Sequence, residues 1–196
     1  ATFQSAKRRI EFCAGRNLVQ QALRRLSSLE DLGLRQQDQL FPLVFNEQKQ
    51  LVVEGASQFQ LSLSHAAEWV GVAVRVLADG QQPGRSSARS AALGFYPAIS
   101  LGFDLEYVDP ARGLEDLERI MRFSFTQKEW VDWSALPRSF KPAAFYRLWS
   151  LKEAYKKATG FPFFQVARTI EFRSLVNPSW AMGCATLEMI PGYVAA

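Results

Sequence analysis

Residues 101–107, Leu-Gly-Phe-Asp-Leu-Glu-Tyr, show an alternation of apolar side chains that strongly constrains the fold. The apolar residues at 101, 103, 105 and 107 predict a strand with one buried face. Asp104 and Glu106 are two residues apart, so both carboxylates should emerge together on the opposite face. Two neighbouring acids repel each other, and a bound cation would remove that penalty. The pattern therefore predicts a strand that carries a candidate cation site.

A second pattern lies in residues 145–157, where Trp149, Glu153 and Lys157 are spaced by four. On a helix these three side chains share one face. Gly160 is a suitable C-cap, so we expect the helix to end just before it. Lys152 points about 100° away from Glu153 on such a helix. We therefore expect Lys152 to organise the site or to contact a partner, and the aromatic side chains Phe145 and Trp149 to belong to the core.

The spacing alone leaves ordinary interpretations open for these residues. Asp104, Glu106 and Glu153 could be solvated surface acids. Lys157 could simply complement the dipole at a helix C-terminus. His65 is the single histidine of the chain, and a lone histidine is more often structural than catalytic.

Other segments of the chain give weaker signals. Hydrophobic periodicity predicts a helix over about 8–29, a short apolar segment over 41–45, and short strands near 52–53, 59–63 and 69–77. A helix is predicted over 114–123, a capping box from Thr126 to Glu129, and antiparallel strands over 166–172 and 185–189. Residues 79–90 are rich in Gly, Pro, Ser and Arg, which predicts a loop between two halves.

Composition limits the class of protein. The 196 residues are 48% hydrophobic and 13% aromatic, which suits one compact domain or two small halves packed together. No apolar run is long enough to span a membrane, and no signal peptide precedes the first helix. Cys13 and Cys184 are too few for a disulfide framework, so we expect a reduced cytoplasmic setting with both cysteines buried. The chain begins without Met, and we expect trimming or disorder at its ends.

The charge balance is mildly basic. Lys and Arg number 23 against 19 Asp and Glu, which gives a net charge of +4. This excess does not indicate nucleic-acid binding. It would suit a phosphate-rich cofactor and an acidic protein partner.

Three motifs in a fixed order resemble the 4'-phosphopantetheinyl transferase family. They are the pair Ser64-His65 after a predicted strand, the strand motif over 102–106 and the helix motif from Trp149 to Lys157. Residues 14–16 and 191–193 match more weakly, so the resemblance spans nearly the whole chain. It is closest to the large, two-lobed type that activates carrier proteins of synthetases.

The resemblance implies an α+β fold of two similar α/β halves. These halves would be related by a pseudo-twofold axis, with the active site between them. Residues 1–100 would form the N-terminal half, which binds coenzyme A. Residues 101–196 would form the C-terminal half, which binds metal and carries out catalysis. A single chain with two such halves is expected to be a monomer.

The resemblance also implies an activity. The protein would transfer the 4'-phosphopantetheine group from coenzyme A to a serine of an apo acyl or peptidyl carrier protein, releasing 3',5'-ADP. Asp104, Glu106 and Glu153 would hold Mg2+, which prefers oxygen ligands. Lys157 would contact the pyrophosphate of coenzyme A. Glu153, directly or through a water, is the candidate general base.

The remaining coenzyme A contacts implied by the resemblance come from the N-terminal half. Ser64 and His65 would contact a phosphate. Arg9, Arg16 and Lys49 would hold the 3'-phosphate and the adenine end.

Two other classes of function stay open. One is a different Mg-dependent phosphoryl or nucleotidyl transferase, and the other is a non-catalytic module that binds coenzyme A or a carrier protein. The identity of the released nucleotide would separate the first from a phosphopantetheinyl transferase.

Overall fold

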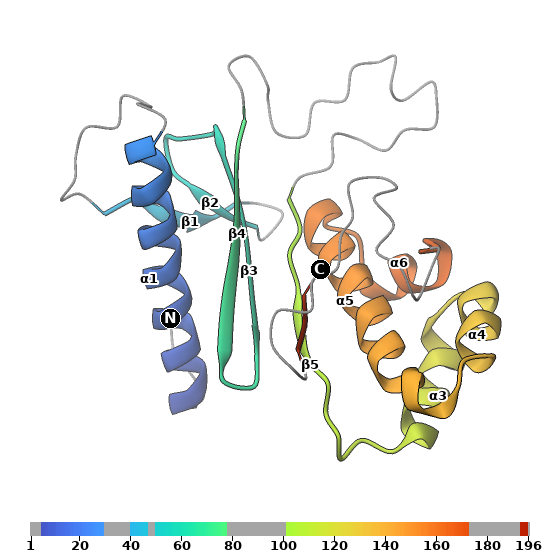
Figure 1. Cartoon of the computed structure of the whole chain (residues 1–196). Coiled ribbons are helices and arrows are strands. Elements are labelled where there is room, and N and C mark those ends of the chain that lie inside the picture. Colours follow the sequence, from blue (N-terminus) through green and yellow to red (C-terminus); the bar gives the residue numbers. More distant parts are fainter. Residues whose placement is uncertain (1–4, 30–39, 47–49, 78–100, 173–192, 196) are drawn as a thin grey trace, which may run out of the picture. The chain divides into compact units, whose positions relative to one another are not determined.

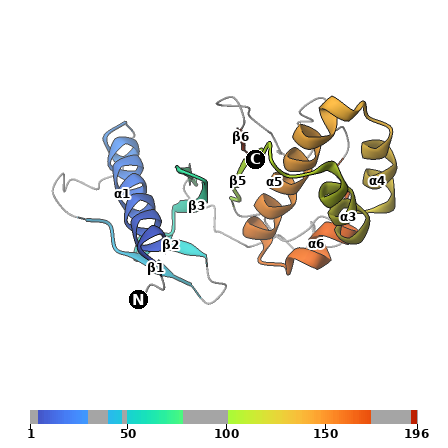
Figure 2. The same ribbon diagram turned by 90° about the horizontal axis from the view of Figure 1, so that it is seen from below.

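The computed structural model describes residues 5–29, 40–46, 50–77, 101–172 and 193–195. The chain divides into two compact units, each considered by itself below. The first contains Ala1–His65 and Trp69–Leu101, and the second contains Ala66–Glu68 and Gly102–Ala196. Helices and strands both occur in the described segments (Figures 1 and 2), so the α+β class is confirmed, while the pseudo-twofold relation stays a prediction.

The first unit is built on one long helix and short strands. Its elements are α1 (Ala6–Leu29), β1 (Leu43–Phe45), β2 (Leu51–Val53), β3 (Phe59–Ala66) and β4 (Trp69–Val76). β1 and β2 are antiparallel, with Val44 opposite Val52, and β3 pairs with β4. The predicted helix and the strands near 52–53, 59–63 and 69–77 are confirmed, with small shifts at their ends, and β1 lies in the predicted apolar segment.

The core of the first unit lies between α1 and the strands. Val19 and Leu23 of α1 are fully buried, as the helical periodicity predicts. They pack with Val53 of β2 and Phe59 of β3. Cys13 is exposed, so its predicted burial is wrong, since it lies away from this stripe. Cys184 and the predicted loop over 79–90 lie outside the described residues.

The second unit contains helices and one short strand pair. Its elements are β5 (Leu105–Tyr107), α3 (Leu114–Ser124), α4 (Gln127–Ser134), the 3-10 helix η1 (Arg138–Phe140), α5 (Lys141–Thr159), α6 (Phe163–Thr169) and β6 (Tyr193–Ala195). β5 and β6 are antiparallel, with Glu106 opposite Val194. The strand at the predicted position is shorter than the alternation over 101–107 suggests.

Local signals account for the ends of two helices. Thr126 and Glu129 form the predicted capping box at the start of α4. Pro142 lies in the first turn of α5, and Gly160 ends that helix with a left-handed φ of 74°. The predicted strand over 166–172 is wrong, because α6 covers most of it.

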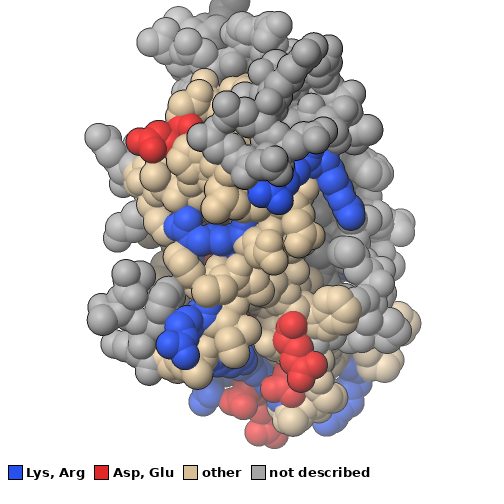
Figure 3. All heavy atoms as spheres, turned by 90° about the vertical axis from the view of Figure 1, so that its left-hand side faces the viewer, with Lys and Arg blue, Asp and Glu red and all other residues tan. Residues whose placement is uncertain are grey.

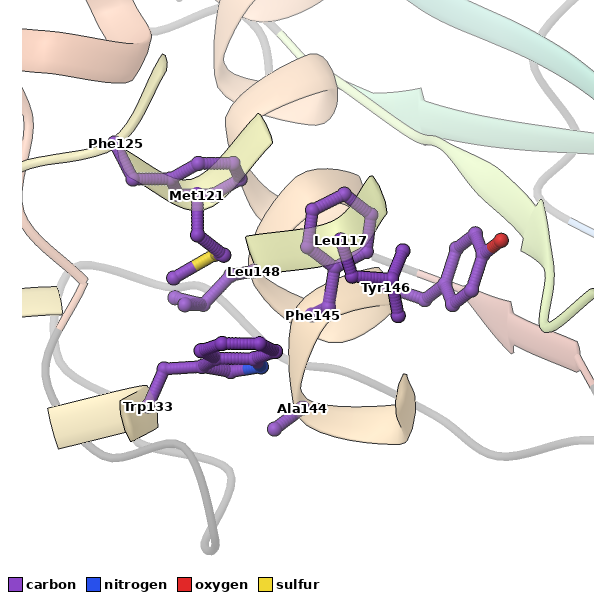
Figure 4. Close-up of a cluster of buried hydrophobic side chains, with 8 residues drawn as sticks. All are labelled: Leu117, Met121, Phe125, Trp133, Ala144, Phe145, Tyr146 and Leu148. Atoms are coloured by element: carbon purple, nitrogen blue, oxygen red, sulfur yellow. The ribbon is translucent and has the colours of Figure 1, made fainter. Parts of the chain in front are cut away.

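An aromatic core joins α3, α4 and α5 in the second unit. Its buried members, drawn in Figure 4, are Leu117, Met121, Phe125, Trp133, Ala144, Phe145, Tyr146 and Leu148. Trp149 is half-buried against this cluster, so the core assignment of Phe145 and Trp149 is confirmed. The core fixes the position of α5, the helix that carries the predicted catalytic residues. Among the described residues, no helix is both long and apolar enough to cross a lipid bilayer.

Candidate active site

Lys157 reaches from α5 to the segment that enters β5. Its Nζ donates a hydrogen bond to Asp104 Oδ1 at 2.7 Å and another to the Phe103 carbonyl oxygen at 3.1 Å. Asp104 is buried, so this ion pair is largely shielded from solvent. The spacing of four along α5 therefore does direct Lys157 toward the predicted acidic strand.

Glu106 experiences the negative charge of two other carboxylates. Burial, followed by repulsion from Asp104 and then Glu153, raises the pKa of Glu106 from 4.5 to about 7, against an opposing effect of Lys157. A shift with these causes requires the three acids to be close enough to interact. The carboxylates predicted from two distant stretches of sequence are thus near enough to repel one another.

Glu153 is also paired in the structure. Lys156 Nζ lies 2.9 Å from Glu153 Oε2, one turn further along α5. The Glu153 side chain is largely buried, whereas Lys156 is more exposed. The spacing of four does not predict this pair, because Lys156 lies three residues after Glu153.

The donor set offers the chemistry that a divalent cation needs, without an arrangement that would hold it. Asp104, Glu106 and Glu153 supply carboxylate oxygens, the ligand type that Mg2+ prefers. Their mutual repulsion, evident in the raised pKa of Glu106, would be relieved by such an ion. In the described part of the chain no three acids, histidines or cysteines form a group arranged to hold a metal. The lysine pairs described above instead neutralise Asp104 and Glu153, and the metal site stays a prediction.

Gly102 allows β5 and α5 to approach closely. A Cβ at this position would lie 1.9 Å from the backbone oxygen of Ala154, far inside contact distance. Any other residue would push the segment bearing Asp104 away from α5. The glycine of the strand motif therefore positions the acids relative to Lys157.

Lys152 is a buried structural cation. Its Nζ lies 2.9 Å from Glu129 Oε2 and donates to the backbone oxygens of Ala167 (2.9 Å) and Ile170 (2.6 Å). Burial lowers the pKa of Lys152, and the negative charge of Glu129 opposes that shift. The expectation that Lys152 organises the site agrees with these contacts. Contact with a partner is ruled out, because the side chain is fully buried.

Glu129 connects three segments, a role that its capping signature alone did not predict. Besides Lys152, its carboxylate accepts hydrogen bonds from the backbone N–H groups of Thr126 and Phe172. The pair therefore links the start of α4, the middle of α5 and the end of α6. Two sequence features could have indicated this pair. Glu129 lies three residues after the cap residue Thr126, and Lys152 lies in the helix motif.

The described residues of the first unit that were predicted to bind coenzyme A lie on α1 and β3. Ser64 is buried near the end of β3, and the next residue, His65, is exposed. His65 Nδ1 lies 3.8 Å from Glu11 Oε1 on α1. Arg9 is exposed on the same helix. Their role in binding an anion stays a prediction.

Arg16 is held by neighbouring groups. Its guanidinium donates to the Leu43 backbone oxygen at 2.9 Å and lies 4.5 Å from the centroid of the Phe12 ring and 5.9 Å from that of Phe45. This arrangement presents a fixed cation next to β1. Lys49 lies outside the described residues.

The first unit also contains a cavity of about 600 Å3. It is lined by residues of β1, β2 and β3 and by the segment between β2 and β3. Among the described residues, Arg9, Arg16, Ser64 and His65 do not line this cavity.

Comparison with known proteins identifies the class. Residues 100–187 match the 4'-phosphopantetheinyl transferase superfamily. The matched region contains all four acidic and basic residues of the second-unit site. The resemblance inferred from the sequence motifs is thereby confirmed.

A curated relative supports the same class. The protein 4'-phosphopantetheinyl transferase HetI of Nostoc sp. (strain PCC 7120 / SAG 25.82 / UTEX 2576) is 45% identical over 98 residues. The match covers 46% of this chain and 38% of the relative. It thus spans well under half of the relative's length.

Proposed function

We propose that this protein transfers the 4'-phosphopantetheine group of coenzyme A to a serine of an apo carrier protein and releases 3',5'-ADP. The observation that carries the proposal is the cluster of Asp104, Glu106, Glu153 and Lys157 inside the segment that matches the superfamily. The carrier supplies the nucleophile, so no activated serine or cysteine is needed in this chain.

The acids of the cluster would hold Mg2+ through Asp104, Glu106 and Glu153. When bound, the ion would supply positive charge that stabilises the pyrophosphate oxygens as the bond within the pyrophosphate breaks. The raised pKa of Glu106, to which repulsion from Asp104 and Glu153 contributes, supports this assignment.

The residues of α5 would perform the remaining steps. Lys157, held beside Asp104, presents a fixed positive charge to the leaving phosphate. Glu153 accepts the proton from the serine hydroxyl. The serine oxygen forms a bond to the β-phosphorus, and the bond from that phosphorus to the oxygen of 3',5'-ADP breaks. The nucleotide leaves with the electron pair.

The N-terminal half would hold the cofactor. Ser64 and His65 at the end of β3 would contact a phosphate of coenzyme A. Arg9, Arg16 and Lys49 would hold the 3'-phosphate and the adenine end. Two such halves related by a pseudo-twofold axis, in a cytoplasmic monomer, complete the proposal.

Mass spectrometry of an apo carrier protein tests this function. The carrier is incubated with coenzyme A, Mg2+ and this protein, and we expect it to gain the mass of one phosphopantetheine group. The nucleotide product, separated by chromatography, should be 3',5'-ADP. A different nucleotide, or an unmodified carrier across acyl and peptidyl carriers, would reject the proposal.

A further inference from the structure

Two phenylalanines form an exposed aromatic pair on the second unit. Phe123 at the end of α3 is 67% exposed, and Phe164 in α6 is 61% exposed. Their rings meet edge to face with centroids 6.5 Å apart. Paired exposed aromatics are typical of interaction surfaces, because such side chains lose little conformational freedom on binding.

The exposed pair is continuous with the candidate active site. Phe164 contacts Phe163 at 6.0 Å between ring centroids, and Phe163 contacts Trp149 of α5 at 4.6 Å. Lys156 Nζ lies 6.0 Å from the Phe163 ring centroid and 2.9 Å from Glu153 Oε2. A row of contacts therefore leads from the solvent-exposed rings to the proposed general base.

Three cations lie near the pair. Arg122 precedes Phe123, stacks on Trp130 at 4.6 Å and pairs with Glu118 at 2.9 Å. Arg168 is exposed on α6, and Lys156, which pairs with Glu153, is partly exposed. A partner that covers the rings would therefore place its own acidic side chains beside these cations.

We propose that the Phe123–Phe164 pair is where the carrier protein docks, through an apolar patch flanked by acids. This inference rests on the proposed function, because it places the acceptor serine near Glu153. It goes beyond that function by naming a recognition surface outside the reacting groups. Buried aromatic side chains contribute strongly at the centre of an interface.

Three variants test the proposal. Phe123→Ser and Phe164→Ser, singly and together, remove the rings. Phe140→Ser is the matched control. Phe140 is similarly exposed, at 62%, but it lies at the N-terminal end of α5, whereas Lys156 lies in the last turn of that helix. Steady-state transfer is measured with saturating Mg2+, varying coenzyme A and the apo carrier separately, alongside thermal melts and sedimentation.

We expect the double variant to raise the KM for the carrier about tenfold or more, the usual effect of losing an aromatic interface residue. The KM for coenzyme A, the melting temperature and the control variant should be unaffected. The proposal is overturned if the carrier KM is unchanged, if Phe140→Ser has an equal effect, or if the coenzyme A KM rises instead. Loss of self-association in place of carrier affinity would also overturn it, since the pair would then join two copies of this chain.

Direct binding separates this proposal from the proposed function. Apo acyl carrier protein and an apo peptidyl carrier domain are titrated into the protein without coenzyme A and followed by calorimetry. Binding that the double variant loses supports docking even if no transfer is found, in which case only the function fails. Absence of binding to the unmodified protein overturns the docking surface.

Discussion

At the scale of single residues, Lys157 is the cation that we propose to act on the phosphate. Its Nζ is fixed by Asp104 and by the Phe103 backbone oxygen. Lys157→Ala should lower kcat/KM. The loss should correspond to roughly 2–4 kcal/mol of transition-state stabilisation, which is the effect of removing one preorganised electrostatic donor. Transfer rates with coenzyme A and carrier measure the effect.

The control for this change is Lys128→Ala. Lys128 forms an exposed pair with Asp132 at 2.7 Å on α4. The Lys128→Ala variant should transfer at nearly the rate of the unaltered protein. Equal losses in both variants would show that Lys157 has no specific role in the reaction. Lys156 is unsuitable as a control because it is bonded to Glu153.

A second residue-scale prediction concerns the pH dependence of stability. The folded protein holds a proton on Glu106 up to about pH 7, whereas an unperturbed glutamate releases it near 4.5. Between these values the folded state binds more protons than the unfolded state. The free energy of unfolding should therefore fall as pH rises, by up to about 3 kcal/mol for this group.

Urea titrations in EDTA at pH 5 and pH 7.5 measure this slope. Glu106→Gln should flatten it, because glutamine does not titrate. The control is Glu115→Gln, because Glu115 lies at the exposed start of α3. This variant should show the same dependence of unfolding free energy on pH as the unaltered protein. A slope that persists in Glu106→Gln would show that other groups cause it.

The sequence predicted much of the second-unit site at this scale. A period of two placed Asp104 and Glu106 together, and a period of four placed Glu153 and Lys157 together. It did not predict which lysine pairs with which acid. Long side chains choose among several partners within reach, and the choice depends on how closely Gly102 lets the strand approach α5.

At the scale of elements, the buried pair of Glu129 and Lys152 holds α5 in place. Lys152→Met should destabilise the fold by roughly 3–5 kcal/mol, because it leaves Glu129 charged and buried without its cation. Replacing both residues, as Lys152→Met with Glu129→Gln, should cost less than the sum of the two single changes.

Chemical denaturation of the four proteins in this cycle measures the coupling. Lys128→Met, which breaks an exposed pair on the same helix as Glu129, should cost at most about 1 kcal/mol. Additive losses for Glu129 and Lys152 would contradict a shared buried interaction.

Element ends were predictable where one residue type fixes the local geometry. Thr126 with Glu129 and the left-handed Gly160 are examples. The failure at α6 has a different cause. Val166 and Ile170 are β-branched and favour a strand, yet Val166 and Ala167 are fully buried on one side of a short helix. Tertiary packing overrides weak local preference there.

At the scale of the whole molecule, the distribution of charge can be followed on one face. The face viewed in Figure 3 shows basic side chains at several separate positions and not in a single patch. Lys152 adds nothing to the outer surface, because it is buried against Glu129. The composition predicted the net charge of +4, but the location of each charge depends on tertiary contacts that no local pattern specifies.

The last prediction concerns how the carrier is attracted to this basic molecule. If carriers approach through long-range attraction, the KM for the carrier should rise between 0.1 M and 1 M salt, as the Debye length shrinks from about 10 Å to about 3 Å. Coenzyme A carries phosphates too, so it must be kept saturating. The variant lacking the Phe123 and Phe164 rings should show a higher KM at every salt concentration, with the same slope, because burial of apolar surface is not screened by salt. A carrier KM that stays flat in the unaltered protein would reject electrostatic steering and leave apolar contact as the source of affinity.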